Sequence, residues 1–176
     1  MAKSNIVLYG FGCTGKSSVA RRLGEVHGLE VVDTDELLVD LEGASIDEIV
    51  QARGEVAFRG MERDLVRDVA QKDGAVIATG SGVPLDPRNV EFLAMTGVGI
   101  LLTASPATVL ARMKAAPNPH PFLKPSFDLG RVAALMSDRR VPYSKIPHRV
   151  ETNGMTVETA TLKVWDLFQK ERKHDS

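Results

Sequence analysis

The sequence holds a single cysteine, Cys13, so it cannot form an intrachain disulfide or a zinc site built from several cysteines. Its first apolar run, at residues 6–9, is too short for a signal-peptide core or a membrane span. Neither sign of charge dominates, because 22 lysines and arginines stand against 23 aspartates and glutamates. This balance offers no broad electrostatic footprint for nucleic acid or an anionic membrane. We therefore expect a cytoplasmic protein that binds neither, and that acts as a monomer.

Short apolar runs alternate with stretches of helical periodicity along all 176 residues. Such an alternation predicts an α/β fold, with a parallel sheet covered by helices on both faces and ligands at the carboxyl ends of its strands. The length fits one domain, residues 1–176. The predicted strands are residues 6–9, 29–32, 75–78, 98–102 and 149–152; the predicted helices are 16–27, 36–41 and 55–70, with two more that begin at Pro87 and Pro106.

Residues 10–17, GFGCTGKS, match the phosphate-loop pattern G-x-x-x-x-G-K-[ST] between a predicted strand and a predicted helix. Glycines let the backbone curl, so that amide groups and the helix N-terminus face the phosphates of a nucleotide. Lys16 would neutralise phosphate charge, and the Ser17 hydroxyl would coordinate Mg²⁺. We interpret Cys13 as a tolerated variable position. The predicted nucleotide-binding residues of this loop are Gly10, Gly12, Cys13, Thr14, Gly15, Lys16, Ser17 and Ser18.

Two aspartates, Asp33 and Asp35, close the second predicted strand. An extended chain would turn both carboxylates to the same side. Beside a phosphate loop, Asp33 is the candidate for holding Mg²⁺ or its waters, and Asp35 for orienting an acceptor hydroxyl. The alternative is that both are N-cap and turn residues ahead of the helix at 36–41.

Four further motifs follow in order: SIDEI at 45–49, GEVAFRGME at 54–62, TGSG at 79–82, and Arg139 four residues before Tyr143. With the phosphate loop and the D-x-D they cover almost the whole chain, which resembles the shikimate kinases. These are small P-loop kinases of the nucleoside-monophosphate-kinase type that transfer the γ-phosphate of ATP to the 3-hydroxyl of shikimate. The resemblance implies a three-layer α/β/α domain with a five-stranded parallel sheet. It also implies an acceptor-binding helical region at about 34–62 and a mobile lid at about 115–126.

The resemblance also implies roles for single residues. Lys16, Asp35 and Arg139 would be catalytic, and Asp35 would also hold ring hydroxyls of the acceptor. Arg59 and Arg139 would grip the acceptor carboxylate, and Glu62 would orient Arg59. The other implied acceptor contacts are Gly80, Ser81, Gly82, Ile46, Val50, Phe58, Pro121 and Phe122, and the adenine ring would lie near Arg112 and Asn153.

The sequence departs from the family pattern at three places. The lid carries His120 where the family usually has arginine, and the usual triple-glycine turn carries Ser81 at its centre. Arg140 follows Arg139 directly and is a rival ligand for the carboxylate. These departures leave two alternatives open. One is a kinase for another hydroxylated carboxylic acid, such as quinate or a sugar acid; the other is a non-catalytic nucleotide-binding relative with an impaired lid.

Overall fold

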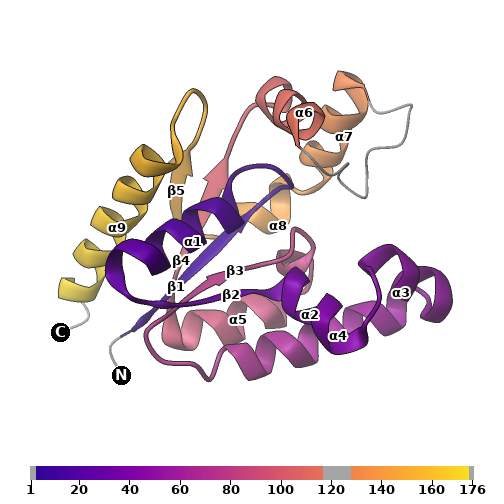
Figure 1. Ribbon diagram of the computed structural model, residues 1–176, viewed down its shortest axis with the longest axis horizontal. Helices are drawn as coiled ribbons and strands as arrows, with labels where there is room; N and C mark the ends of the chain where they lie inside the picture. The colour runs from indigo at the N-terminus through magenta and orange to yellow at the C-terminus, as the bar shows by residue number, and fades with distance from the viewer. Residues whose placement is uncertain (1–2, 117–127, 175–176) are drawn as a thin grey trace.

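The computed structural model describes residues 3–116 and 128–174, and it contains the predicted parallel sheet (Figure 1). The strand order is β2-β3-β1-β4-β5, and every neighbouring pair is parallel. The five predicted strands are confirmed, with ends that shift by at most one residue. The strands are β1 (Asn5–Gly10), β2 (Glu30–Asp33), β3 (Ala75–Ala78), β4 (Gly97–Thr103) and β5 (His148–Glu151).

Helices cover both faces of this sheet, as predicted (Figure 1). The alternation of side chains along β1 shows the two layers, because Ile6 and Leu8 point to one core and Val7 and Tyr9 to the other. The first core packs against α1 and α9, and the second against α4 to α8. The helices are α1 (Lys16–His27), α2 (Thr34–Glu42), α3 (Ile46–Arg53), α4 (Glu55–Val69), the 3₁₀ helix η1 (Val83–Leu85), α5 (Pro87–Thr96), α6 (Pro106–Ala115), α7 (Leu129–Asp138), α8 (Arg140–Ser144) and α9 (Val157–His174).

Helices α2, α3 and the start of α4 stand beyond the end of β2 as a small helical region (Figure 1). They enclose a core of their own, in which Leu38, Ile49 and Phe58 are buried. A capping box at Ser45 fixes the start of α3: the Ser45 hydroxyl accepts from the Glu48 amide, while the Glu48 carboxylate accepts from the Ser45 amide. This region coincides with the predicted acceptor-binding segment.

The prediction that residues 33–35 form an extended chain is wrong. β2 ends at Asp33, and Asp35 lies in the first turn of α2, which begins two residues before the predicted helix. The reason is helix capping, since the Asp33 carboxylate accepts from the amides of Asp35 and Glu36.

The predicted lid falls almost entirely outside the described residues. α6 ends at Ala115, and the segment that holds His120, Pro121 and Phe122 is not part of the described ranges. The predictions for these three residues therefore remain predictions. Within 3–116 and 128–174, no helix combines the length and the apolar character that a bilayer crossing requires.

Candidate active site

A cavity of about 400 Å³ opens at the carboxyl ends of β1, β2 and β3, where the fold class places ligands. The phosphate loop forms one wall, and the start of α2 and the turn after β3 form the others. Its lining residues are Gly12, Cys13, Gly15, Lys16, Ser17, Ser18, Asp33, Asp35, Glu36, Ile46, Thr79 and Ser81. The structure thus brings predicted phosphate and metal residues together with Asp35, Ile46 and Ser81 of the predicted acceptor set, from four separate segments of the chain.

Lys16 folds its ammonium back over the phosphate loop. Its Nζ donates to the carbonyl oxygens of Gly10 at 2.9 Å and Phe11 at 3.0 Å. Burial lowers the pKa of this ammonium, while the nearby carboxylates of Asp35 and Asp33 act in the opposite direction. The charge therefore stands in the mouth of the loop, where an incoming phosphate would meet it.

Asp33, a predicted metal ligand, contacts both the phosphate loop and the start of α2. Its Oδ2 accepts a hydrogen bond from the Ser17 hydroxyl at 2.5 Å, while its Oδ1 caps α2. One carboxylate thus ends β2, starts α2 and reaches the phosphate loop. A hydroxyl beside a carboxylate is an all-oxygen donor set, and Mg²⁺ prefers oxygen ligands and usually completes its shell with substrate phosphates and water. Ser17 and Asp33 therefore fit a magnesium ion.

Asp35 is half-buried and lines the cavity. Desolvation by burial raises its pKa, and the like charge of Asp33 raises it further, whereas Lys16 and Arg59 act to lower it. A carboxyl group in such an environment is a candidate for contact with a reacting hydroxyl.

The turn after β3 brings the backbone against two of these side chains. A Cβ on Gly80 would lie 2.3 Å from Asp35 Oδ1, and a Cβ on Gly82 would lie 2.1 Å from Arg59 Nη1. A side chain at Gly80 would therefore displace the Asp35 carboxylate, and one at Gly82 would displace the Arg59 guanidinium. The Gly80 amide also donates to the Thr34 hydroxyl at 2.8 Å, which ties the turn to the start of α2.

Ser81, which stands in place of the family's central glycine, lines the cavity with a backbone outside the left-handed region. The serine therefore adds no backbone strain there. Its carbonyl accepts from Arg139 Nη1 at 2.6 Å and from the Tyr143 hydroxyl at 2.9 Å. Burial raises the pKa of Tyr143 to about 12, so this hydroxyl stays protonated and donates.

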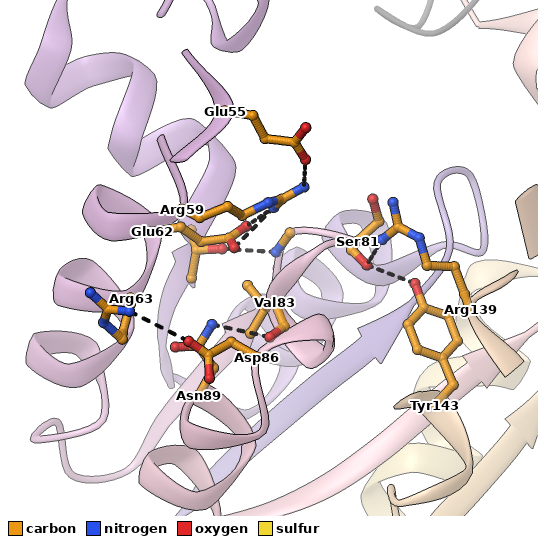
Figure 2. A network of polar contacts seen from close by, with 12 residues as sticks. Glu55, Arg59, Glu62, Arg63, Ser81, Val83, Asp86, Asn89, Arg139 and Tyr143 are labelled. Carbon is orange, nitrogen blue, oxygen red and sulfur yellow. Dashed lines mark hydrogen bonds and ion pairs between the residues drawn. The ribbon is translucent and has the colours of Figure 1, made fainter. Parts of the chain in front are cut away.

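Arg59 approaches the same turn from α4 and is held there by Glu62. Both carboxylate oxygens of Glu62 accept from Arg59 Nη1, at 3.1 and 3.0 Å. Glu62 is 5% exposed, and burial raises its pKa, although the charge of Arg59 and its hydrogen bonds act to lower it. Glu55 is a looser and exposed partner, 3.5 Å away. Figure 2 shows Arg59 and Arg139 on opposite sides of Ser81.

Arg139 and Arg140, the two candidate ligands for the acceptor carboxylate, have different environments. Arg139 is half-buried in the junction between α7 and α8 and contacts Ser81, whereas Arg140 is exposed. Phe58 does not line the cavity, because it is buried between Leu38 and Ile49 in the core of the helical region. Ile46, at the start of α3, supplies apolar wall instead, with Val50 packed behind it against that core.

A second cavity of about 310 Å³ lies on the other side of the phosphate loop. Arg112 lines it, as the adenine prediction requires. Asn153 does not, because its side chain accepts from the Ser105 amide at 2.9 Å and donates to Glu151 at 2.5 Å. The full lining is Cys13, Thr14, Gly15, Ser18, Val19, Arg112, Thr152, Met155, Thr156, Val157 and Ala160.

The family model for shikimate kinase matches residues 12–168 of the chain. The chain belongs to the shikimate kinase family. It is accordingly a phosphotransferase with an alcohol acceptor. The shikimate kinase of Geobacter metallireducens is 37% identical over 160 residues, covering 91% of this chain and 89% of the relative. That of Caldicellulosiruptor saccharolyticus is 36% identical over 170 residues, covering 96% and 98%.

Solved shikimate kinases have the same fold. The enzyme from Acinetobacter baumannii in complex with shikimate superposes with a TM-score of 0.87 at 28% identity, covering 96% of this chain and 94% of that one. The enzyme from Bacteroides thetaiotaomicron, at 22% identity, has a TM-score of 0.88 over 94% and 98% of the two chains and shows the fold alone.

Several residues of the site were given no role by the sequence patterns. Thr34 and Tyr143 hold the turn after β3, and Thr152 and Met155 line the second cavity. Glu36 lines the first. Only Tyr143 had a signal, its spacing of four residues from Arg139. The others take part because strand ends that are distant in sequence meet at one edge of the sheet.

Proposed function

We propose that this protein transfers the γ-phosphate of ATP to the 3-hydroxyl of shikimate. The observation that carries the proposal is the position of Asp35, in one cavity with Lys16 and against the turn that Arg59 and Arg139 flank. A phosphate loop, an aspartate and two guanidinium groups are what a kinase for a hydroxylated carboxylic acid needs in one place. A. baumannii shikimate kinase, which was solved with shikimate, shares this fold over nearly the entire chain.

On the donor side, the phosphate loop would hold the phosphates, and the cavity beside Arg112 would receive the adenine ring. Ser17 and Asp33 would hold a magnesium ion, directly or through water, and this ion would neutralise charge on the phosphate oxygens. Lys16 would leave the loop carbonyls of Gly10 and Phe11 for the phosphate.

On the acceptor side, Arg59 and Arg139 would bind the carboxylate, since guanidinium groups match its geometry with paired hydrogen bonds. The half-buried, site-facing position of Arg139 favours it over the exposed Arg140. Asp35 would accept the hydrogen bond of the attacking hydroxyl. Because phosphoryl transfer passes through a loose transition state, Asp35 would contribute by aligning this hydroxyl more than by removing its proton.

Every described group of the candidate site comes from a single chain, so we propose that the monomer is active. The single cysteine and the ATP requirement favour the cytoplasm, where thiols stay reduced. We propose a small-molecule acceptor and neither nucleic acid nor membrane as partner, in line with the balanced charge.

The proposal is tested by a coupled ADP-release assay with Mg²⁺ and ATP against a panel of hydroxy acids. The panel contains shikimate, quinate and sugar acids. We expect turnover with shikimate and at least tenfold lower kcat/KM with the others. Preference for another acid of the panel would replace shikimate as the acceptor. Nucleotide binding without transfer to any of them would identify a non-catalytic relative, and a His120→Arg variant would then test the lid.

Glu62→Gln is expected to raise the KM for shikimate about tenfold, because a neutral amide holds the Arg59 guanidinium less firmly than a carboxylate does. The KM for ATP should change less than twofold. Glu55→Gln is the matched control: Glu55 also contacts Arg59 but is exposed, so it should have little effect on either constant. Steady-state kinetics with each substrate varied in turn makes the measurement. An unchanged KM for shikimate in Glu62→Gln would contradict the orienting role of Glu62.

A further inference from the structure

We propose that Thr152 is a positioning residue of the phosphate loop. It follows β5 directly, and its amide donates to the Thr103 carbonyl at 2.8 Å, so the sheet fixes its place. Its side chain is buried, with 3% of the residue exposed. This inference rests on the proposed function at one point: the loop that Thr152 positions is the loop that we propose binds ATP.

The Thr152 hydroxyl lies between the phosphate loop and the end of β4. Its Oγ1 is 3.1 Å from the carbonyl oxygen of Thr14 and 3.1 Å from that of Thr103, and it accepts from Arg112 Nη1 at 3.0 Å. The single hydroxyl proton is therefore shared between two carbonyls. The contact joins residues 14 and 152, at opposite ends of the chain.

Arg112 binds the preceding carbonyl of the phosphate loop, that of Cys13. Its Nη1 is 3.3 Å from the Cys13 carbonyl, and its Nη2 donates to the Thr152 carbonyl at 2.6 Å. Two successive carbonyls of the phosphate loop are thus bound, that of Cys13 by Arg112 of α6 and that of Thr14 by Thr152, which follows β5. Thr152 holds one of them directly and the other through Arg112.

This arrangement sets the direction of a loop amide. In a trans peptide the carbonyl and the N–H point in opposite directions. With the Thr14 carbonyl turned to Thr152, the N–H of Gly15 points away from β5. Gly15 lines the 400 Å³ cavity as well as the 310 Å³ cavity beside Thr152, and an N–H turned away from Thr152 is open to a phosphate.

The backbone at Cys13 indicates that the loop needs such support. Cys13 has a φ of 60°, the single positive value at a non-glycine position in the described ranges. A side chain in this region costs about 1 kcal/mol or more and persists only where surrounding contacts impose it. The contacts of Arg112 and Thr152 with the carbonyls of residues 13 and 14 are contacts of this kind.

The test compares Thr152→Val, which removes the hydroxyl at nearly constant shape, with Thr152→Ser, which keeps it. Calorimetric titration with Mg²⁺ and ADP, in the absence of any acceptor, measures the dissociation constant. We expect about tenfold weaker binding for Thr152→Val, and binding within twofold of wild type for Thr152→Ser. The KM for shikimate should change less than twofold in both, because Thr152 does not line the acceptor cavity.

Thr161→Val is the matched control for a merely structural effect. Thr161 is 4% exposed, and its hydroxyl donates to the Val157 carbonyl at 2.7 Å within α9, while Thr161 itself lines neither cavity of the site. This variant should lose stability in thermal unfolding without losing ADP affinity. Equal weakening of ADP binding in Thr161→Val and Thr152→Val would overturn the proposal, as would wild-type affinity in Thr152→Val.

If Thr152→Val does not fold, Thr152→Ala takes its place with the same expected loss and the same contradicting result. The ADP titration also keeps this proposal separate from the acceptor assignment. A wild-type protein that binds ADP but phosphorylates no acid would refute the proposed function and leave the role of Thr152 standing. A wild-type protein that binds no ADP would refute both.

Discussion

Replacing Lys16 with alanine is expected to lower kcat/KM for phosphate transfer by about a thousandfold or more, the scale of losing a charge aimed at the transferring phosphoryl group. Lys16 is the cation that the structure places in the mouth of the phosphate loop, held by the carbonyls of Gly10 and Phe11. Its partial burial makes it effective, since charge interactions strengthen where water is excluded. Initial rates in the coupled assay, at varied ATP and saturating shikimate, make the measurement.

Lys163→Ala is the control for this experiment, because Lys163 is exposed on α9, away from both cavities of the site. It should leave kcat/KM within twofold of wild type. Retention of more than a tenth of the wild-type rate by Lys16→Ala would show that the loop lysine does not neutralise phosphate charge in the transition state.

Replacing Asp35 with asparagine is expected to lower kcat by about a hundredfold or more. The amide keeps the shape of the side chain but lacks a second acceptor oxygen and the charge that align the attacking hydroxyl. In the wild type, the raised pKa of Asp35 also predicts that activity falls on the acid side at a pH above the ordinary aspartate range. A pH profile of kcat for the two proteins makes the measurement.

The same substitution is expected to leave folding stability unchanged or to raise it at neutral pH. The pKa of Asp35 is raised in the folded protein, so its ionised form is penalised by folding, and this penalty is fully present above the folded-state pKa. It disappears as the pH falls below the ordinary aspartate value. Asp35→Asn removes the penalty, and thermal unfolding at neutral and acid pH should show the gain shrinking toward acid.

Asp40→Asn is the matched control on the same helix. Asp40 lies on α2 but is exposed, so the change should alter neither kcat nor the acid side of the profile. An Asp35→Asn variant that is less stable than wild type at neutral pH would contradict the electrostatic account. One that keeps more than a tenth of the wild-type kcat would contradict the positioning role.

The sheet could be predicted because buried parallel strands require short apolar runs whatever surrounds them, as at residues 75–78. The backbone conformation of Asp35 was not predicted correctly. Residues 33–35 follow the apolar run of a strand, which led us to expect an extended chain. The Asp33 carboxylate caps a helix instead, so α2 begins at Thr34 and includes Asp35. Both carboxylates line the same cavity, as expected from the sequence, but with a different local conformation.

Other parts of the site depend on tertiary contacts that no local pattern encodes. Nothing in the adjacent pair Arg139 and Arg140 says which one faces the site; the end of α7 and its packing decide it. Thr152 contacts the phosphate loop across the whole length of the chain. α7 itself was not predicted, although Asp128 caps it, because the proline-rich segment before it indicated a loop.

The central claim is that the phosphate loop and the groups around Asp35 hold a donor and an acceptor against each other. Phosphorus NMR of a mixture of the protein, Mg²⁺, ATP and shikimate tests it most directly, because the coupling pattern identifies the oxygen that receives the phosphate. The account predicts one phosphate ester at the 3-hydroxyl, formed in equal amount with ADP. Inorganic phosphate alone, or an ester at another hydroxyl, would contradict it.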